Sequence, residues 1–83
     1  MRIERLVTMA NDIGAFFDAE PDKVEAAKGV ASHVRRFWDP RMRREIIAHY
    51  RQGGHGLDDI VRAAIGILAE ADEGQRAEGK GQR

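Results

Sequence analysis

The sequence contains no cysteine, so no disulfide can stabilise it and no cysteine-based metal site can form. Its three histidines, His33, His49 and His55, do not make up a metal-ligand set. A chain of 83 residues forms at most one domain, and a domain of this size buries a smaller fraction of its surface than a larger one does. Packing must therefore hold the fold together, either alone or with help from a partner chain.

The sequence also lacks a long apolar run and a net charge. No segment is apolar enough to span a membrane, and residues 1–10 lack the hydrophobic stretch of a signal peptide, so we expect a cytoplasmic protein. The 14 basic and 14 acidic residues cancel, but they are unevenly distributed. Residues 33–51 carry six arginines against two acids, whereas segments 12–25 and 57–73 each carry five acids against one base. A basic centre is thus flanked by two acidic segments.

Apolar residues recur at three- and four-residue steps, which is the pattern of amphipathic helices, and no strand pattern or repeat is present. The helical segments are interrupted at residues 19–22, 39–40 and 53–56. We therefore predict an all-α domain over residues 1–72, a small compact bundle or orthogonal array of four helices. Residues 73–83 have no large apolar side chain and are expected to form a disordered tail.

The predicted core is the apolar face of each helix. Its members are Ile3, Leu6, Val7, Ala10, Ile13, Gly14 and Phe17, then Val24, Ala27, Ala31, Val34 and Trp38, then Met42, Ile46, Ile47 and Tyr50, and finally Ile60, Val61, Ala64, Ile65 and Leu68. Pro21 suits the first turn of the second helix. Asp39 suits the N-cap of the third, with Pro40 at its first position, and Asp58 suits the N-cap of the fourth.

Neither the acids nor the glycines of this sequence indicate catalysis. The candidate general acids and bases all lie at predicted helix ends, where capping accounts for them: Asp18, Glu20, Asp22, Asp58 and Asp59. Segment 53–56, Gly-Gly-His-Gly, precedes a helix as a phosphate-binding loop would, but no strand comes before it and no Lys-Ser/Thr pair follows. We therefore predict a turn there, and a protein that is not itself an enzyme.

Segment 35–44 combines arginines with aromatic residues at the corner between two predicted helices. Three interpretations are open: a solvated basic face with aromatic residues in the core, a docking surface for another protein, or a small nucleic-acid-binding or regulatory protein that uses residues 35–51. The zero net charge and the acidic flanking segments disfavour nucleic acid, because domains that bind it are usually basic overall.

Two pairs of adjacent aromatic residues favour docking. Consecutive helical residues point about 100° apart, so Phe37 and Trp38 cannot share one narrow apolar face, and the same holds for Phe16 and Phe17. Each pair therefore places apolar surface on a second side of its helix, which in so small a chain suits a partner interface. The predicted interface consists of Phe37, Trp38, Asp39, Pro40, Arg41, Arg43 and Arg44.

Three segments carry a family resemblance. Residues 9–17 read Met-Ala-Asn-Asp-Ile-Gly-Ala-Phe-Phe, residues 34–43 read Val-Arg-Arg-Phe-Trp-Asp-Pro-Arg-Met-Arg, and residues 53–64 read Gly-Gly-His-Gly-Leu-Asp-Asp-Ile-Val-Arg-Ala-Ala. In this order, over residues 5–68, they resemble the delta subunits of NAD-dependent formate dehydrogenases that contain molybdenum or tungsten.

The resemblance implies a non-catalytic accessory subunit. Such a subunit docks on the catalytic alpha subunit and supports assembly, stability or insertion of the molybdenum cofactor. The larger subunits hold bis-molybdopterin guanine dinucleotide, iron–sulfur clusters and FMN, oxidise formate and reduce NAD; the delta subunit holds none of these groups, which agrees with the lack of cysteine. In one variant of this role the arginines bind the phosphates of the guanine dinucleotide during cofactor insertion. Neither nucleic acid nor a membrane is an expected partner.

Overall fold

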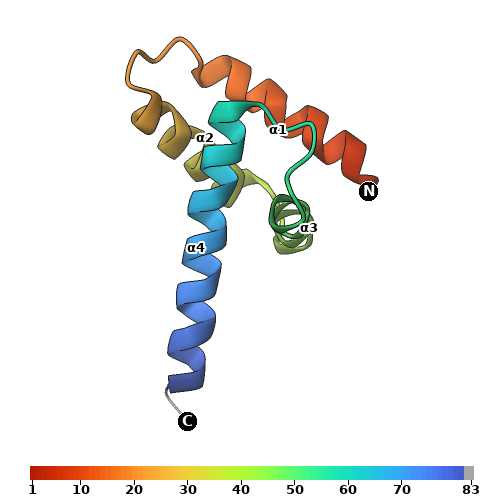
Figure 1. The fold of residues 1–83 in the computed structure, drawn as a ribbon, viewed down its shortest axis with the longest axis vertical. Coiled ribbons are helices and arrows are strands. Elements are labelled where there is room, and N and C mark those ends of the chain that lie inside the picture. The colour runs from red at the N-terminus through yellow and green to blue at the C-terminus, as the bar shows by residue number, and fades with distance from the viewer. Residues whose placement is uncertain (82–83) are drawn as a thin grey trace.

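A computed structural model describes the backbone of residues 1–81 and the side chains of residues 1–74 (Figure 1). Its four helices are α1 (Ile3–Phe17), α2 (Lys23–Phe37), α3 (Pro40–Arg51) and α4 (Asp59–Gly81), and the described residues contain no strand. Figure 1 shows α4 running roughly across α1, with α3 seen almost end-on beside it. The four helices therefore form an orthogonal array, which is one of the two arrangements that the sequence predicts.

The core lies where α2 packs between α1 and α4, and α3 closes it from the side. The predicted apolar faces are confirmed for α1, α3 and α4, whose inward residues are buried or packed against the core. In α2 the prediction is wrong at Val24, which is 63% exposed, because the first turn of this helix projects beyond its neighbours (Figure 1). Ala26 and Val30 are buried instead, so the buried face of α2 is wider than the predicted stripe.

Aspartate caps define the starts of the two middle helices. The carboxylate of Asp22 accepts hydrogen bonds from the backbone amides of Val24 (3.0 Å) and Glu25 (3.3 Å). Asp22 is therefore the N-cap of α2, and Pro21 lies outside the helix rather than in its first turn as predicted. The prediction for α3 is confirmed, since Asp39 accepts from the amide of Met42 at 2.9 Å. Each cap satisfies amides that would otherwise lack a partner.

Helix α4 continues beyond residue 72, where the sequence analysis ends the domain. Arg51, at the end of α3, lies 3.5 Å from the carboxylate of Asp72 and 3.4 Å from that of Glu73, and it donates to the carbonyl of Ala69. These contacts hold the middle of α4 against α3. The predicted disordered tail covers residues 73–83; the backbone of residues 73–81 continues α4 in the structure, whereas residues 82–83 lie outside the described residues.

Candidate subunit-docking surface

Trp38 is a core residue, which corrects its expected place in a docking surface. It is 5% exposed and belongs to the main hydrophobic cluster. The chain leaves the helical conformation at this residue, with φ −91° and ψ 139°, and Asp39 is extended as well. This two-residue corner turns the indole inward and leaves the preceding Phe37 outward. A partner can therefore reach Phe37 but not Trp38.

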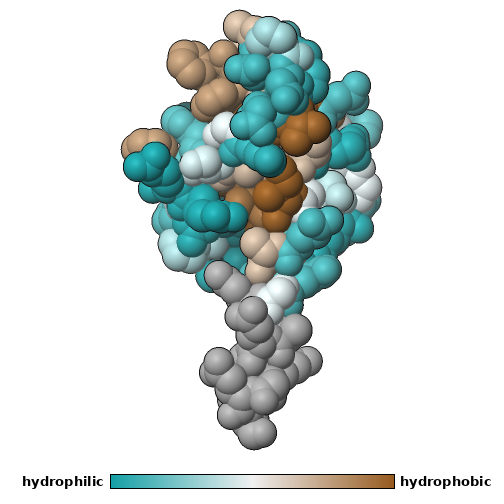
Figure 2. Space-filling view, turned by 90° about the vertical axis from the view of Figure 1, so that its left-hand side faces the viewer, coloured by the Kyte–Doolittle hydropathy of each residue, from teal (hydrophilic) through white to brown (hydrophobic). Residues whose placement is uncertain are grey.

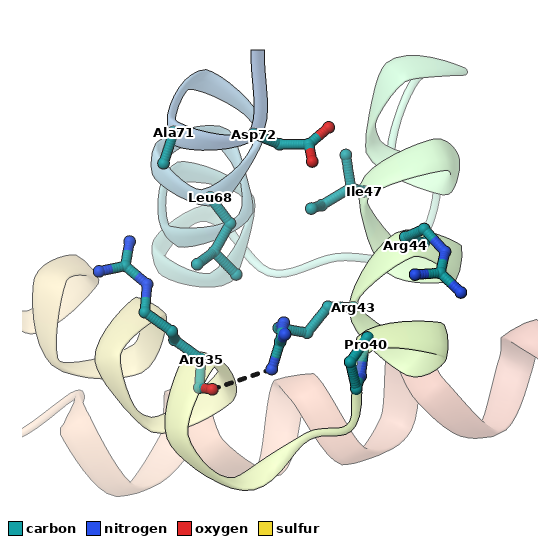
Figure 3. Close-up of a pocket in the computed structure, with 8 residues that line it drawn as sticks. All are labelled: Arg35, Pro40, Arg43, Arg44, Ile47, Leu68, Ala71 and Asp72. Carbon is teal, nitrogen blue, oxygen red and sulfur yellow. Dashed lines mark hydrogen bonds between the residues drawn. The ribbon is translucent and has the colours of Figure 1, made fainter. Parts of the chain in front are cut away.

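Arg43 closes the same corner from the α3 side. One nitrogen of its guanidinium donates to the carbonyl of Arg35 at 3.0 Å (Figure 3) and to that of Trp38 at 2.6 Å. Both carbonyls belong to the C-terminal end of α2, where no further turn of helix can satisfy them. Arg43 thus caps α2 with its side chain, and this positioning role is one that the sequence analysis missed.

Some of the remaining predicted interface residues stabilise the fold, and the others present their side chains to solvent. Asp39 is committed to the cap of α3, and Arg41 forms an exposed ion pair with Glu45 at 3.7 Å. Pro40 and Arg44 are exposed. Such a surface pair contributes little to stability, so Arg41 remains available to a partner. Of the seven predicted residues, four present side chains to solvent without a core or capping role: Phe37, Pro40, Arg41 and Arg44.

A group of exposed and half-buried rings, which we call the aromatic surface, lies across α1 and α2 and consists of Phe16, Phe17, His33 and Phe37. Phe16 is 80% and Phe37 71% exposed. The rings of Phe16 and Phe17 meet edge-on with centroids 5.2 Å apart, and those of His33 and Phe37 lie 4.7 Å apart. His33 also lines a shallow hollow together with Phe16 and Phe17, which joins the two pairs.

The sequence pattern predicts apolar surface at residues 16–17 and 37–38, but not that His33 links Phe16 and Phe17 to Phe37. Packing of α1 against α2 brings residues 16–17 beside residue 33. Phe17 lies over Gly29, where a Cβ atom would approach its ring more closely than 3.0 Å. Figure 2, which views the molecule from the side of the α1–α2 loop, shows hydrophobic residues reaching the surface in separate patches between hydrophilic ones.

A second feature, which we call the arginine groove, lies between the end of α2, the side of α3 that faces α4, and the middle of α4 (Figure 3). Its volume is about 340 Å³. Figure 3 shows Ile47 and Leu68 facing each other across the groove. Arg35 lies on its α2 side, and Arg43 and Arg44 lie on its α3 side. The residues that line it are Arg35, Pro40, Arg43, Arg44, Ile47, Leu68, Ala71 and Asp72.

The glycine segment is a tied turn, as predicted. Gly53, Gly54 and Gly56 have φ values of 116°, 63° and 88°, a region that side chains with a Cβ atom rarely adopt. The guanidinium of Arg62 donates to the carbonyls of Gly53 (2.6 Å) and Gly54 (3.0 Å), and the His49 ring shares a hydrogen bond with the carbonyl of His55. These side-chain bonds hold the turn in place, so it has a structural role.

Asn11 links the first motif segment to the third. Its side-chain amide donates to the carbonyl of Gly56 at 2.9 Å, and its side-chain oxygen accepts from the amide of Asp58 at 3.0 Å. One side chain on α1 thus satisfies both a carbonyl and an amide of the turn that leads into α4. The requirement for both a donor and an acceptor explains an amide residue at this position.

The described residues do not assemble a metal centre. Within residues 1–74, no three histidine, aspartate or glutamate side chains come close enough to hold a metal ion. Asp18 pairs with Lys23, and Asp22 is a helix cap. Nor does any helix in this part of the chain have the length and apolar character needed to cross a membrane.

Residues 5–65 match a family model, that of NADH-dependant formate dehydrogenase delta subunit FdsD. The match confirms the resemblance drawn from the three motif segments, all of which it contains. Neither the curated proteins nor the solved structures give a match. The aromatic surface lies within the matched range, whereas the α4 wall of the arginine groove lies beyond it.

Proposed function

We propose that this chain, which belongs to the family of delta subunits of NADH-dependent formate dehydrogenases, docks on the catalytic alpha subunit through its aromatic surface and supports assembly and stability of the complex. Family membership makes it an accessory subunit of a dehydrogenase complex that partners with other subunits. Beyond family membership, we propose the alpha subunit as the partner, the aromatic surface as the contact, and assembly and stability of the complex as the role. The observation that carries it is the exposure of Phe16 and Phe37, at 80% and 71%.

Two exposed phenylalanine rings are unfavourable for a small protein in water. Burying apolar surface stabilises by about 25 cal/mol per Å², so leaving two rings exposed forgoes stability that a chain of this size needs. The two rings also lie on one surface, joined by Phe17 and His33, rather than as scattered single residues. Grouped aromatic residues of this kind are typical anchors of protein interfaces. Covering them with a partner subunit recovers the lost stabilisation.

Charged residues at the edge of the aromatic surface form a polar rim. Arg36 precedes Phe37 at the exposed end of α2, and Asp12 lines the hollow beneath Phe16. Neither side chain is buried. An apolar centre with both signs of charge at its edge is the usual arrangement of a specific interface, in which the charges set orientation more than affinity.

The redox centres are proposed to lie in the larger subunits. The sequence has no cysteine to hold an iron–sulfur cluster, and the described histidines and acids do not gather into a metal site. Among the described acids, Asp22 and Asp39 cap helices and Asp18 pairs with Lys23. Bis-molybdopterin guanine dinucleotide, FMN and NAD accordingly belong to the proposed partners, and the delta subunit acts on the complex through contact alone.

Co-expression of the tagged delta subunit with the other subunits tests the proposal. We expect Phe16→Ala and Phe37→Ala together to reduce the alpha subunit that co-purifies at least tenfold, since interface anchors of this type contribute about 2 kcal/mol or more. The matched control is Val24→Ala, an exposed apolar residue of α2 outside the aromatic surface. Undiminished co-purification of a double variant that is still folded would rule out this surface as the docking site.

A further inference from the structure

The arginine groove is positively charged and is separate from the aromatic surface. Arg35 and Arg44 form no ion pair with any of the residues that the structure describes, and Arg43 is bonded only to uncharged carbonyls. The one acid in the lining, Asp72, is already paired with Arg51 from outside the groove. Three cations therefore face one anion whose charge is largely compensated, and the groove favours an anionic occupant.

The groove also has an apolar part, which narrows the chemistry of that occupant. Ile47 and Leu68 face each other at its centre, and exposed Pro40 and Ala71 flank them (Figure 3). A phosphate group matches the arginines but gains nothing from these apolar residues. A peptide with an apolar side chain between carboxylates matches both parts, because the side chain covers Pro40 and Ala71 while the carboxylates reach the arginines.

Contacts within the subunit hold the three walls of the groove in place without an occupant. Arg43 is fixed by its two carbonyl bonds to the end of α2, and Arg51 holds α4 against α3. The three walls therefore keep their spacing in the free subunit. A preformed groove spares its ligand the free energy of ordering the site.

We propose that the arginine groove binds an acidic, partly apolar peptide segment of the subunit on which the protein docks, as a second contact apart from the aromatic surface. This inference rests on the proposed function, since the segment belongs to the docked partner. Arg35 and Arg44 bind its carboxylates from opposite sides, and Ala71 and Pro40 contact its apolar side chain.

Site-specific photo-crosslinking in the assembled complex identifies the occupant. A benzophenone amino acid replaces Ala71, which is exposed at the groove, and a control replaces Ala63, an exposed alanine on the same helix outside the groove. We expect Ala71 to crosslink to a partner segment that contains at least two acids, and Ala63 not to crosslink to that segment. A crosslink to a basic or uncharged segment, to nucleic acid or within the delta subunit itself overturns the proposal.

Charge removal supplies the second measurement. The variant with Arg35→Ala and Arg44→Ala should bind the remaining subunits about tenfold more weakly at low salt, and the difference should shrink as salt screens the charges. Arg5→Ala, an exposed arginine on α1, should leave the affinity unchanged. Equal affinities for all three proteins overturn the groove proposal while leaving docking by the aromatic surface intact. Failure of the unaltered delta subunit to co-purify instead overturns the proposed function and the groove with it.

Discussion

The guanidinium of Arg43 donates a 2.6 Å hydrogen bond to the carbonyl of Trp38, across the corner where α2 gives way to α3. The same guanidinium reaches the carbonyl of Arg35 one turn earlier. Arg43 thus caps the preceding helix, whereas the nearby Arg41 and Arg44 face solvent. The corner separates residues that hold the fold from residues that are free to meet a partner.

Removing this cap should destabilise the free subunit. We expect Arg43→Ala to lower the free energy of unfolding by about 1.5–3 kcal/mol, because hydrogen bonds from a charged donor contribute about that much. Arg41→Ala is the control, since its exposed pair with Glu45 should contribute less than about 1 kcal/mol. Urea unfolding followed by circular dichroism measures both. Equal losses for the two variants would contradict the capping role.

Trp38 and Phe37 should respond in opposite ways to truncation. Trp38→Ala empties a core site and should cost about 3–5 kcal/mol of stability, whether or not a partner is present. Phe37→Ala should change the stability of the free subunit by no more than about 0.5 kcal/mol, since its ring is 71% exposed. Thermal unfolding of each isolated variant distinguishes them. A large loss of stability in Phe37→Ala would mean that its ring supports the fold rather than an interface.

Asn11 should be more important for stability than its half-buried position on α1 suggests. Asn11→Ala leaves the carbonyl of Gly56 and the amide of Asp58 without their partner, and we expect a loss of about 1–3 kcal/mol. Asp12→Ala, the exposed neighbour, provides the comparison. Amide hydrogen exchange should localise the effect, with faster exchange at residues 56–58 in the Asn11 variant alone.

Two glycines in helices should tolerate alanine very differently. A Cβ atom on Gly14 would lie closer than 3.0 Å to a methyl group of Val61, so Gly14→Ala should destabilise by about 1–3 kcal/mol through overpacking. A Cβ atom on Gly74 would meet no described atom within 4 Å, and alanine there should stabilise by up to about 1 kcal/mol through its better helix propensity. A melting temperature below that of the unaltered protein for Gly14→Ala, and above it for Gly74→Ala, would confirm the close approach of α1 to α4.

The sequence predicted what depends on local chemistry. The apolar spacing identified the buried faces, and Asp39-Pro40 identified the start of α3, because both follow from the geometry of a single helix. The prediction for Pro21 is wrong because Asp22 is the N-cap of α2. The carboxylate of Asp22 accepts two backbone amides, so the helix starts after Pro21.

What the sequence could not predict depends on contacts between distant residues. The bonds of Asn11 to residues 56 and 58 span more than forty positions, and no periodicity encodes them. The meeting of Phe16 with His33, and the formation of the arginine groove from three helices, likewise depend on how the helices cross. The apolar spacing places Trp38 in the core, whereas its adjacency to Phe37 and the arginines places it in the docking surface, and the extended corner at residues 38–39 decides between the two.

The inward position of the indole at residue 38 gives the subunit an internal spectroscopic reporter. Because the chain has a single tryptophan, its fluorescence comes from one site in the hydrophobic cluster. Emission from the isolated protein should therefore shift to longer wavelength when the junction of α2 and α3 opens to water. Quenching by iodide, which does not enter a packed interior, should stay weak until that same transition.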